Sequence, residues 1–117
     1  QIYNEISQIN EMNKLEYFKE NYEDRFGELP LPFINLFSYQ EIKILALKIG
    51  VQNINLNERN CLIKFNYDIF GLTNIIKPLI KLDSKFTNKN IRIYGDLNIQ
   101  ELNIILTKIL DLKSNLI

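Results

Sequence analysis

Residues 21–50 read NYEDRFGELPLPFINLFSYQEIKILALKIG, and this stretch predicts two helices joined by a rigid turn. The first helix ends at Phe26, and Gly27 follows because glycine adopts the left-handed conformation that closes a helix without steric cost. The longest apolar helix of the chain is predicted over Phe33–Ile49, and Gly50 ends it in the same way. The rest of the fold is expected to pack around this second helix.

Two prolines stiffen the connection between these helices. Pro30 and Pro32 disfavour helical geometry in the residues before them, so Leu29 and Leu31 are expected to be extended. Pro32 suits a first helical turn, where its missing N–H would have had no partner. The angle between the two helices is therefore expected to be set locally.

Two apolar stripes run along Phe33–Ile49, whereas a surface helix shows one. The first stripe comprises Ile42, Leu45, Ala46 and Ile49, and the second comprises Phe33, Leu36, Phe37, Ile44 and Leu47. The side chains expected to lie in water are Gln40, Glu41, Lys43 and Lys48. Two stripes imply neighbours on two sides, so this helix is predicted to lie in the core.

The remaining periodicities predict an α+β fold with helices packed on small antiparallel β-hairpins. The expected elements, in the order α-α-α-β-β-α-β-β-α, are helices at 1–9, 11–26 and 33–49, a hairpin of 51–56 with 61–65, a helix at 72–82, a hairpin of 85–87 with 91–94, and a helix at 97–113. Asn10 and Asp96 are the expected caps of the second and last helices. The core face of the second helix is predicted to carry Leu15, Phe18, Tyr22 and Phe26. Pro78 implies either a later start or a kink in its helix.

Composition describes one globular domain with little sign of a charged ligand. The 117 residues are 46% hydrophobic and 24% charged, and 14 basic residues balance 14 acidic ones. A neutral chain with lysines spread along the sequence argues against a dedicated nucleic-acid module. A single cysteine and the lack of a long apolar run favour a cytoplasmic protein. Because residue 1 is Gln, residues 1–117 are expected to be one domain of a longer protein, with residues 1–10 the remnant of a preceding helix.

Catalytic chemistry is not expected within these residues. The sequence has no His, the commonest general base and metal ligand. Cys61 lies in a predicted strand and fits core packing better than nucleophilic attack. The four glycines are isolated and form no phosphate-binding loop. No enzyme activity, cofactor or metal is therefore predicted here.

A known family shares the organising stretch. Asp24-Arg25-Phe26-Gly27, Leu29-Pro30, Asn35-Leu36, Leu45-Ala46 and Lys48-Ile49-Gly50-Val51 together resemble the C-terminal (TRCF) domain of the bacterial transcription-repair coupling factor, Mfd. The motifs are specific over residues 21–51, and beyond about residue 66 only the order of elements agrees.

This resemblance implies a regulatory domain of an ATP-dependent DNA translocase that couples transcription to nucleotide excision repair. In the family, the domain docks on a UvrB-like module of the same chain and masks its UvrA-binding surface until the motor engages stalled RNA polymerase. ATP, Mg²⁺ and the main DNA contacts belong to other domains of such a protein. An alternative is a nucleic-acid or other protein-contact module within the same translocase, which a salt-sensitive DNA affinity would reveal.

The resemblance also implies an interdomain interface on the second helix. The partner surface is expected to be basic, so the acidic outer face of this helix is the candidate, with Asp24, Asn21, Arg25 and Glu20 as its residues. Many relatives carry Glu where this chain has Asn21, which implies a looser clamp. Two alternatives are open: Arg25 pairs with Glu28 or a helix end, and Asp24 is simply solvated.

Overall fold

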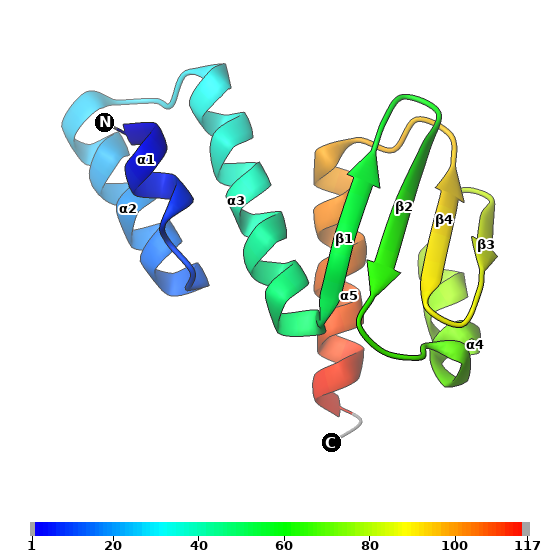
Figure 1. The fold of residues 1–117 in the computed structure, drawn as a ribbon. Helices are drawn as coiled ribbons and strands as arrows, with labels where there is room; N and C mark the ends of the chain where they lie inside the picture. Colours follow the sequence, from blue (N-terminus) through cyan, green and yellow to red (C-terminus); the bar gives the residue numbers. More distant parts are fainter. Residues whose placement is uncertain (1, 116–117) are drawn as a thin grey trace. The chain divides into compact units, whose positions relative to one another are not determined.

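The computed structural model describes residues 2–115 (Figure 1). These residues form two compact units, and the boundary in the chain lies between Ile44 and Leu45. The predicted order of helices and strands is confirmed, and the fold is α+β. The elements are α1 (Ile2–Ser7), α2 (Met12–Phe26), α3 (Leu31–Ile49), β1 (Val51–Leu56), β2 (Asn60–Phe65), α4 (Thr73–Ile76), β3 (Ser84–Phe86), β4 (Asn90–Tyr94) and α5 (Ile99–Asn115). That all 117 residues form one domain stays a prediction.

The first unit consists of α1, α2 and most of α3. Its buried core comprises Ile6, Leu15, Leu29, Phe37 and Ile44. Phe18 of α2 packs on this core, and its ring centroid lies 6.1 Å from that of Phe37 on α3. Phe33 and Leu36 of the predicted second stripe also pack here, so the stripe is confirmed up to Ile44.

The helix α3 begins at Leu31, two residues earlier than predicted, and the expected extended conformation of Leu31 is wrong. The carbonyl of Pro30 accepts hydrogen bonds from the backbone N–H of Phe33 at 2.9 Å and of Ile34 at 3.1 Å. These bonds favour the helical geometry that a following proline disfavours, and Pro32 lies in the first turn as predicted.

Two side chains of α3 do not lie where the periodicity places them. Gln40, expected in water, is 4% exposed, and its amide donates to the carbonyls of Ile9 at 2.8 Å and Ser7 at 3.4 Å. The segment after α1 leaves these carbonyls without helical partners, and a buried carbonyl needs a donor. Leu47, expected in a buried stripe, is 71% exposed because it lies beyond Ile44, where the core of the first unit ends.

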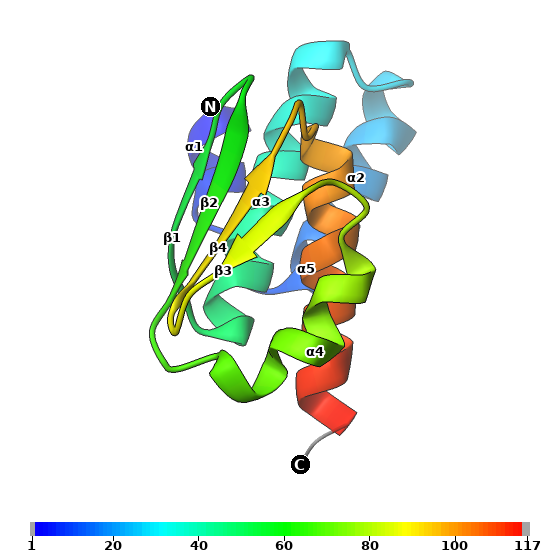
Figure 2. The ribbon, with the colours of Figure 1, turned by 90° about the vertical axis from the view of Figure 1, so that its right-hand side faces the viewer.

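The second unit is a four-stranded antiparallel sheet with one face covered by helices. The strand order is β1-β2-β4-β3, and both predicted hairpins are confirmed. In Figure 2, α4 and α5 lie on the same side of this sheet. The strand residues beneath them are fully buried: Cys61, Ile63, Phe65, Ile91 and Ile93. From α5, Leu102, Ile105, Leu106 and Ile109 are buried, and Ile99 is half-buried.

The helix predicted over 72–82 is present but shorter, because only Thr73–Ile76 is α-helical. Single 3₁₀ turns flank it at Phe70–Leu72 and Lys77–Leu79. Pro78 is the physical reason, since it lacks the N–H that would continue the α-helix. The tighter 3₁₀ turn accommodates it at its first positions.

Both predicted helix caps are wrong. Asn98 caps α5 instead of Asp96: the Glu101 N–H donates to its Oδ1 at 2.8 Å, and the Asn98 N–H donates to Glu101 Oε1 at 3.3 Å. This reciprocal pair is a capping box, so α5 begins at Ile99. Glu11, not Asn10, occupies the cap position of α2 and makes no side-chain capping bond. Among residues 2–115, no helix is both long and apolar enough to span a bilayer.

Candidate functional site on the second helix

The sequence EDRFG contains the end of α2, and its glycine fixes where the helix stops. The backbone of Gly27 has φ +83°, and its N–H donates to the carbonyl of Glu23 at 2.8 Å. Only glycine adopts this conformation easily, which explains why the helix stops at Phe26 as predicted.

Three rows of side chains spaced four residues apart cover α2 between Glu16 and Phe26. The acidic row is Glu16, Glu20 and Asp24; the polar row is Tyr17, Asn21 and Arg25; the aromatic row is Phe18, Tyr22 and Phe26. Each step of four residues turns by roughly 40° around the helix. The aromatic row therefore leaves the core toward its end, and Phe26, expected in the core, is 69% exposed. Its ring lies 4.9 Å from that of Tyr22.

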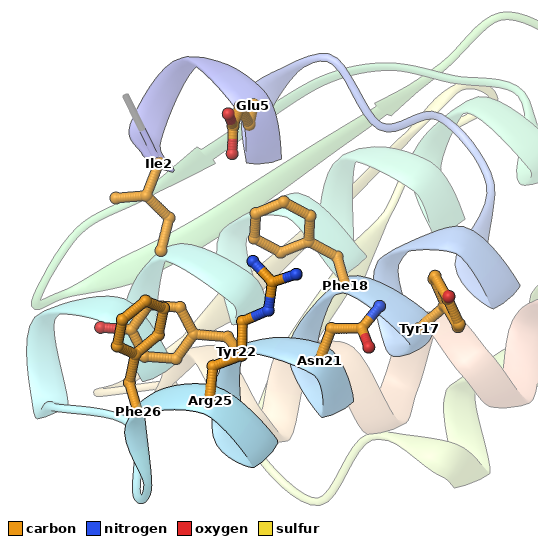
Figure 3. Close-up of a pocket in the computed structure, with 8 residues that line it drawn as sticks. All are labelled: Ile2, Glu5, Tyr17, Phe18, Asn21, Tyr22, Arg25 and Phe26. Atoms are coloured by element: carbon orange, nitrogen blue, oxygen red, sulfur yellow. The ribbon is translucent and has the colours of Figure 1, made fainter.

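A hollow of about 540 Å³, the α1–α2 hollow, lies beside the polar row (Figure 3). It is lined by Ile2, Glu5, Tyr17, Phe18, Asn21, Tyr22, Arg25 and Phe26. Figure 3 shows the guanidinium of Arg25 directed into the space between α1 and α2, near Phe18. The walls are thus largely aromatic, with one cation and one carboxylate.

All four residues predicted to form the interface are exposed on α2, and the structure brings them together. Asn21 and Arg25 line the hollow, and Glu20 and Asp24 lie in the adjacent acidic row. Within the described part of the chain, their side chains form no hydrogen bond or ion pair. In particular, Arg25 forms no ion pair with Glu28 and no hydrogen bond to a helix end among the described residues, and its role at an interface stays a prediction.

Several acidic residues of α2 oppose the stability of the helix, although Arg25 in the last turn favours it. Glu23 and Asp24 lie in the last turn, at the negative end of the helix dipole, where acidic side chains are unfavourable. Glu20 and Asp24 are also four residues apart, and like charges at this spacing destabilise a helix by roughly 0.2–0.5 kcal/mol. Side chains that violate local rules without an internal partner are typical of functional surfaces.

The chemistry of other polar groups is limited. Cys61 is buried, and burial raises the pKa of its thiol to about 11, so it is protonated at neutral pH. Among the described residues, no three or more His, Cys, Asp or Glu side chains are grouped so that they could hold a metal ion.

Comparison with known proteins identifies the family. Residues 1–70 match the family model described as the TRCF domain. The chain belongs to the TRCF domain family. This match covers more than half of the chain, including α1, α2, α3 and the first hairpin.

The TRCF domain described here also resembles individual proteins. It is 30% identical over 86 residues to the transcription-repair-coupling factor of Rickettsia bellii and 34% identical over 88 residues to that of Rickettsia conorii. These matches cover 74–75% of this chain but only 7–8% of each relative. A crystal structure of the C-terminal domain of a transcription-repair coupling factor shares the fold, with a TM-score of 0.80 at 20% identity over 97% of this chain and 80% of that one.

Sequence reasoning placed the polar residues of this TRCF domain site but missed the hollow. Tyr17 completes the polar row at the same spacing as Asn21 and Arg25, which is a signal that the sequence contains. Ile2 and Glu5 come from α1, and their position beside α2 depends on packing within the first unit. No local pattern reports such packing.

Proposed function

We propose that this TRCF domain is an autoinhibitory interaction domain of a cytoplasmic, ATP-dependent DNA translocase that couples transcription to nucleotide excision repair. In this proposal it docks on the UvrB-like module of its own parent protein. It thereby masks the UvrA-binding surface until the motor engages stalled RNA polymerase. ATP and Mg²⁺ act in the motor, and this domain contributes binding alone.

The acidic row of α2 is the observation that carries the proposal. Glu20 and Asp24 are exposed, repel each other and have no partner among the described residues. A basic partner surface relieves this repulsion and forms charge-assisted hydrogen bonds with the carboxylates. The first unit supports this polarity, because residues 1–44 hold eight acidic and four basic residues.

The α1–α2 hollow gives the same interface an apolar component. Its aromatic walls suit an apolar side chain of the partner, while Asn21 and Arg25 at its edge offer polar contacts. A central apolar anchor surrounded by polar contacts is the usual anatomy of a specific interface. The acidic row then sets the orientation, since complementary charges fix the register of docking.

A clamp that a motor must open requires a limited interface. Interdomain contacts bury roughly 600–1,500 Å², which allows a closed and an open population to exchange. Asn21 fits this requirement, because an amide offers weaker attraction to a basic partner than the Glu that the family resemblance implies at this position. The clamp in this protein is therefore expected to open more easily than one with that Glu.

The test measures binding of this 117-residue chain, added in trans, to the UvrB-like module of its parent protein. We expect Asp24→Ala to weaken binding several-fold and Asp24→Arg to weaken it by about tenfold or more, equivalent to ~1.4 kcal/mol. The matched control is Asp111→Ala, an exposed carboxylate of α5 in the second unit.

The same mixture reports masking directly. Capture of UvrA by the module should fall as the wild-type chain is added, and it should recover with Asp24→Arg. Equal affinity of the wild type and both Asp24 variants would remove the acidic row from the interface. Simultaneous binding of UvrA and the wild-type chain to one module would refute autoinhibition.

A further inference from the structure

One face of the sheet in the second unit carries no helix. Side chains alternate along strands, so the residues between the buried positions point away from α4 and α5. This open sheet face consists of Asn53 and Asn55 on β1, Asn60, Leu62 and Lys64 on β2, Asn90, Arg92 and Tyr94 on β4, and Lys85 on β3. All nine are exposed or half-buried.

The charges on the open sheet face are all positive. Three of its residues, Lys64, Lys85 and Arg92, are cationic, and none of the nine is acidic. Lys85 and Arg92 are directly opposite each other on neighbouring strands, where like charges destabilise a sheet. A hydrogen bond from Arg92 Nη1 to Asn60 Oδ1, 3.1 Å long, holds the guanidinium on this face.

Cations also flank the face at both ends of the strands. Lys89 lies in the turn beside the end of β2, where its carbonyl accepts from the Phe65 N–H at 2.8 Å. Arg59 lies at the other end, and its carbonyl accepts from the Gly95 N–H at 2.8 Å. Both are exposed, and the nearby carboxylates, Glu58, Asp83 and Asp96, lie in loops outside the face.

The second unit as a whole is also positively charged, although the net charge of the whole sequence is zero. Residues 45–117 hold ten basic and six acidic residues, a net charge of +4, whereas residues 1–44 have a net charge of −4. The neutral total therefore does not argue against binding of a polyanion by the second unit. The lysines that are spread along the sequence converge on one surface when the strands pair.

We propose that the open sheet face binds single-stranded nucleic acid. Lys64, Lys85 and Arg92 contact phosphates, and the exposed ring of Tyr94 stacks on a base. Protein-binding surfaces have an apolar, charge-poor centre, which this face lacks because Leu62 is its sole aliphatic residue. Surfaces that bind nucleic acid are polar and positive, and this face is polar and carries three cations and no carboxylate. An open sheet with an exposed aromatic ring suits unpaired bases, whose flat faces a duplex hides.

This site is independent of the clamp proposed for α2. It lies in the second unit, and each of its residues differs from those of the acidic row and the α1–α2 hollow. Failure of either proposal therefore leaves the other standing.

The test measures binding of the whole 117-residue chain to a labelled oligothymidine of about 20 nucleotides by fluorescence anisotropy. A duplex of equal length and polyglutamate serve as competitors. Each phosphate contact of a single strand contributes about −0.7 to the slope of log K against log salt. Three to five contacts therefore predict a slope of about −2 to −3.5. We expect the single strand to bind more tightly than both competitors.

Two double variants distinguish a specific site from attraction by net charge alone: one reverses two charges on the face, and the other reverses two charges outside it. Lys64→Glu with Lys85→Glu should weaken binding by about tenfold or more and flatten the salt slope by about 1.4. The control is Lys48→Glu with Lys108→Glu, which changes the net charge equally at exposed helical positions. Tyr94→Ala should weaken binding by roughly fivefold or more without changing the slope, because stacking releases no counterions.

Several outcomes would overturn the proposal. Equal loss of affinity in the face and control variants would mean general charge attraction. Tighter binding of the duplex would exclude a single-strand site, and tighter binding of polyglutamate would indicate an acidic protein partner. Circular dichroism of each variant establishes that the fold is retained, so a loss of affinity reflects the surface alone.

Discussion

At the scale of single residues, three residues of the second unit fix the end of α3: Tyr67, Lys113 and Gly50. The carbonyl of Ile49 accepts hydrogen bonds from the Tyr67 hydroxyl at 2.8 Å and from Lys113 Nζ at 2.7 Å. Lys113 also lies 5.0 Å above the Tyr67 ring, a cation–π contact. Gly50 follows with φ +90°, so the chain turns directly beneath Tyr67.

Gly50→Ala should destabilise the protein by about 1–3 kcal/mol or more. The φ of +90° strains any other residue, and the added Cβ would lie 2.7 Å from Tyr67 Cε1. Moving Tyr67 would also break its bond to Ile49. The matched control is Gly71→Ala, whose Cβ has no neighbour within 4 Å. Urea unfolding followed by circular dichroism measures both, and equal stabilities of the two variants would contradict this account.

At the scale of elements, the sequence predicted which segments are helices and strands but not how their ends are satisfied. The hairpins and the apolar stripes of α3 and α5 follow from hydrophobic period, because core burial decides them. A helix cap depends on the rotamer of a single side chain, which hydrophobic period does not predict. At the start of α5, two polar residues could act as the cap, Asp96 and Asn98. Asn98 prevails over Asp96 because only Asn98 lies three residues before Glu101, the spacing of a capping box.

The α5 cap makes an element-scale prediction. Asn98→Ala should lower the free energy of unfolding by about 1 kcal/mol, since it removes the acceptor of the Glu101 N–H. Asp96→Ala should change it by less than about 0.5 kcal/mol, as expected for an exposed residue with no special contact. Thermal or urea unfolding distinguishes the two. A larger effect at Asp96 would restore the cap that the sequence first suggested.

Gln40 illustrates a second limit at this scale. Its polarity and its place on α3 predict a solvent-exposed side chain, yet it is buried because two backbone carbonyls in the α1–α2 connection need donors. Those carbonyls come from residues more than 30 positions away. Long-range satisfaction of backbone groups leaves no trace in local periodicity.

At the scale of the whole molecule, the arrangement of charge differs from its total. The neutral sequence divides into a negative first unit and a positive second unit, each with a surface that carries its sign. The acidic row of α2 could be predicted from helical spacing, since all its residues belong to one element. The open sheet face could not, because its cations come from three strands whose pairing had to be known.

Alkaline pH should destabilise the molecule through two weak acids of the second unit, the buried thiol of Cys61 and the half-buried phenol of Tyr67. Burial raises the pKa of Cys61 to about 11 and also raises the pKa of Tyr67. In the unfolded chain these groups lose their protons at lower pH, so above about pH 9 the unfolded state binds fewer protons than the folded state. The stability that the neutral groups contribute is therefore complete below that pH and decreases as pH rises through 11.

Urea unfolding at intervals between pH 8 and 11 measures this loss. Other titrating groups also change over this range, so variants must isolate the two acids. Cys61→Ala should be less stable at every pH, because it removes a buried sulfur, yet its stability should decline less steeply with pH. Tyr67→Phe should flatten the remaining decline while losing the bond to Ile49. Identical pH slopes in the wild type and Cys61→Ala would show that the pKa of the thiol is the same in the folded and unfolded states, and the linkage would then be wrong.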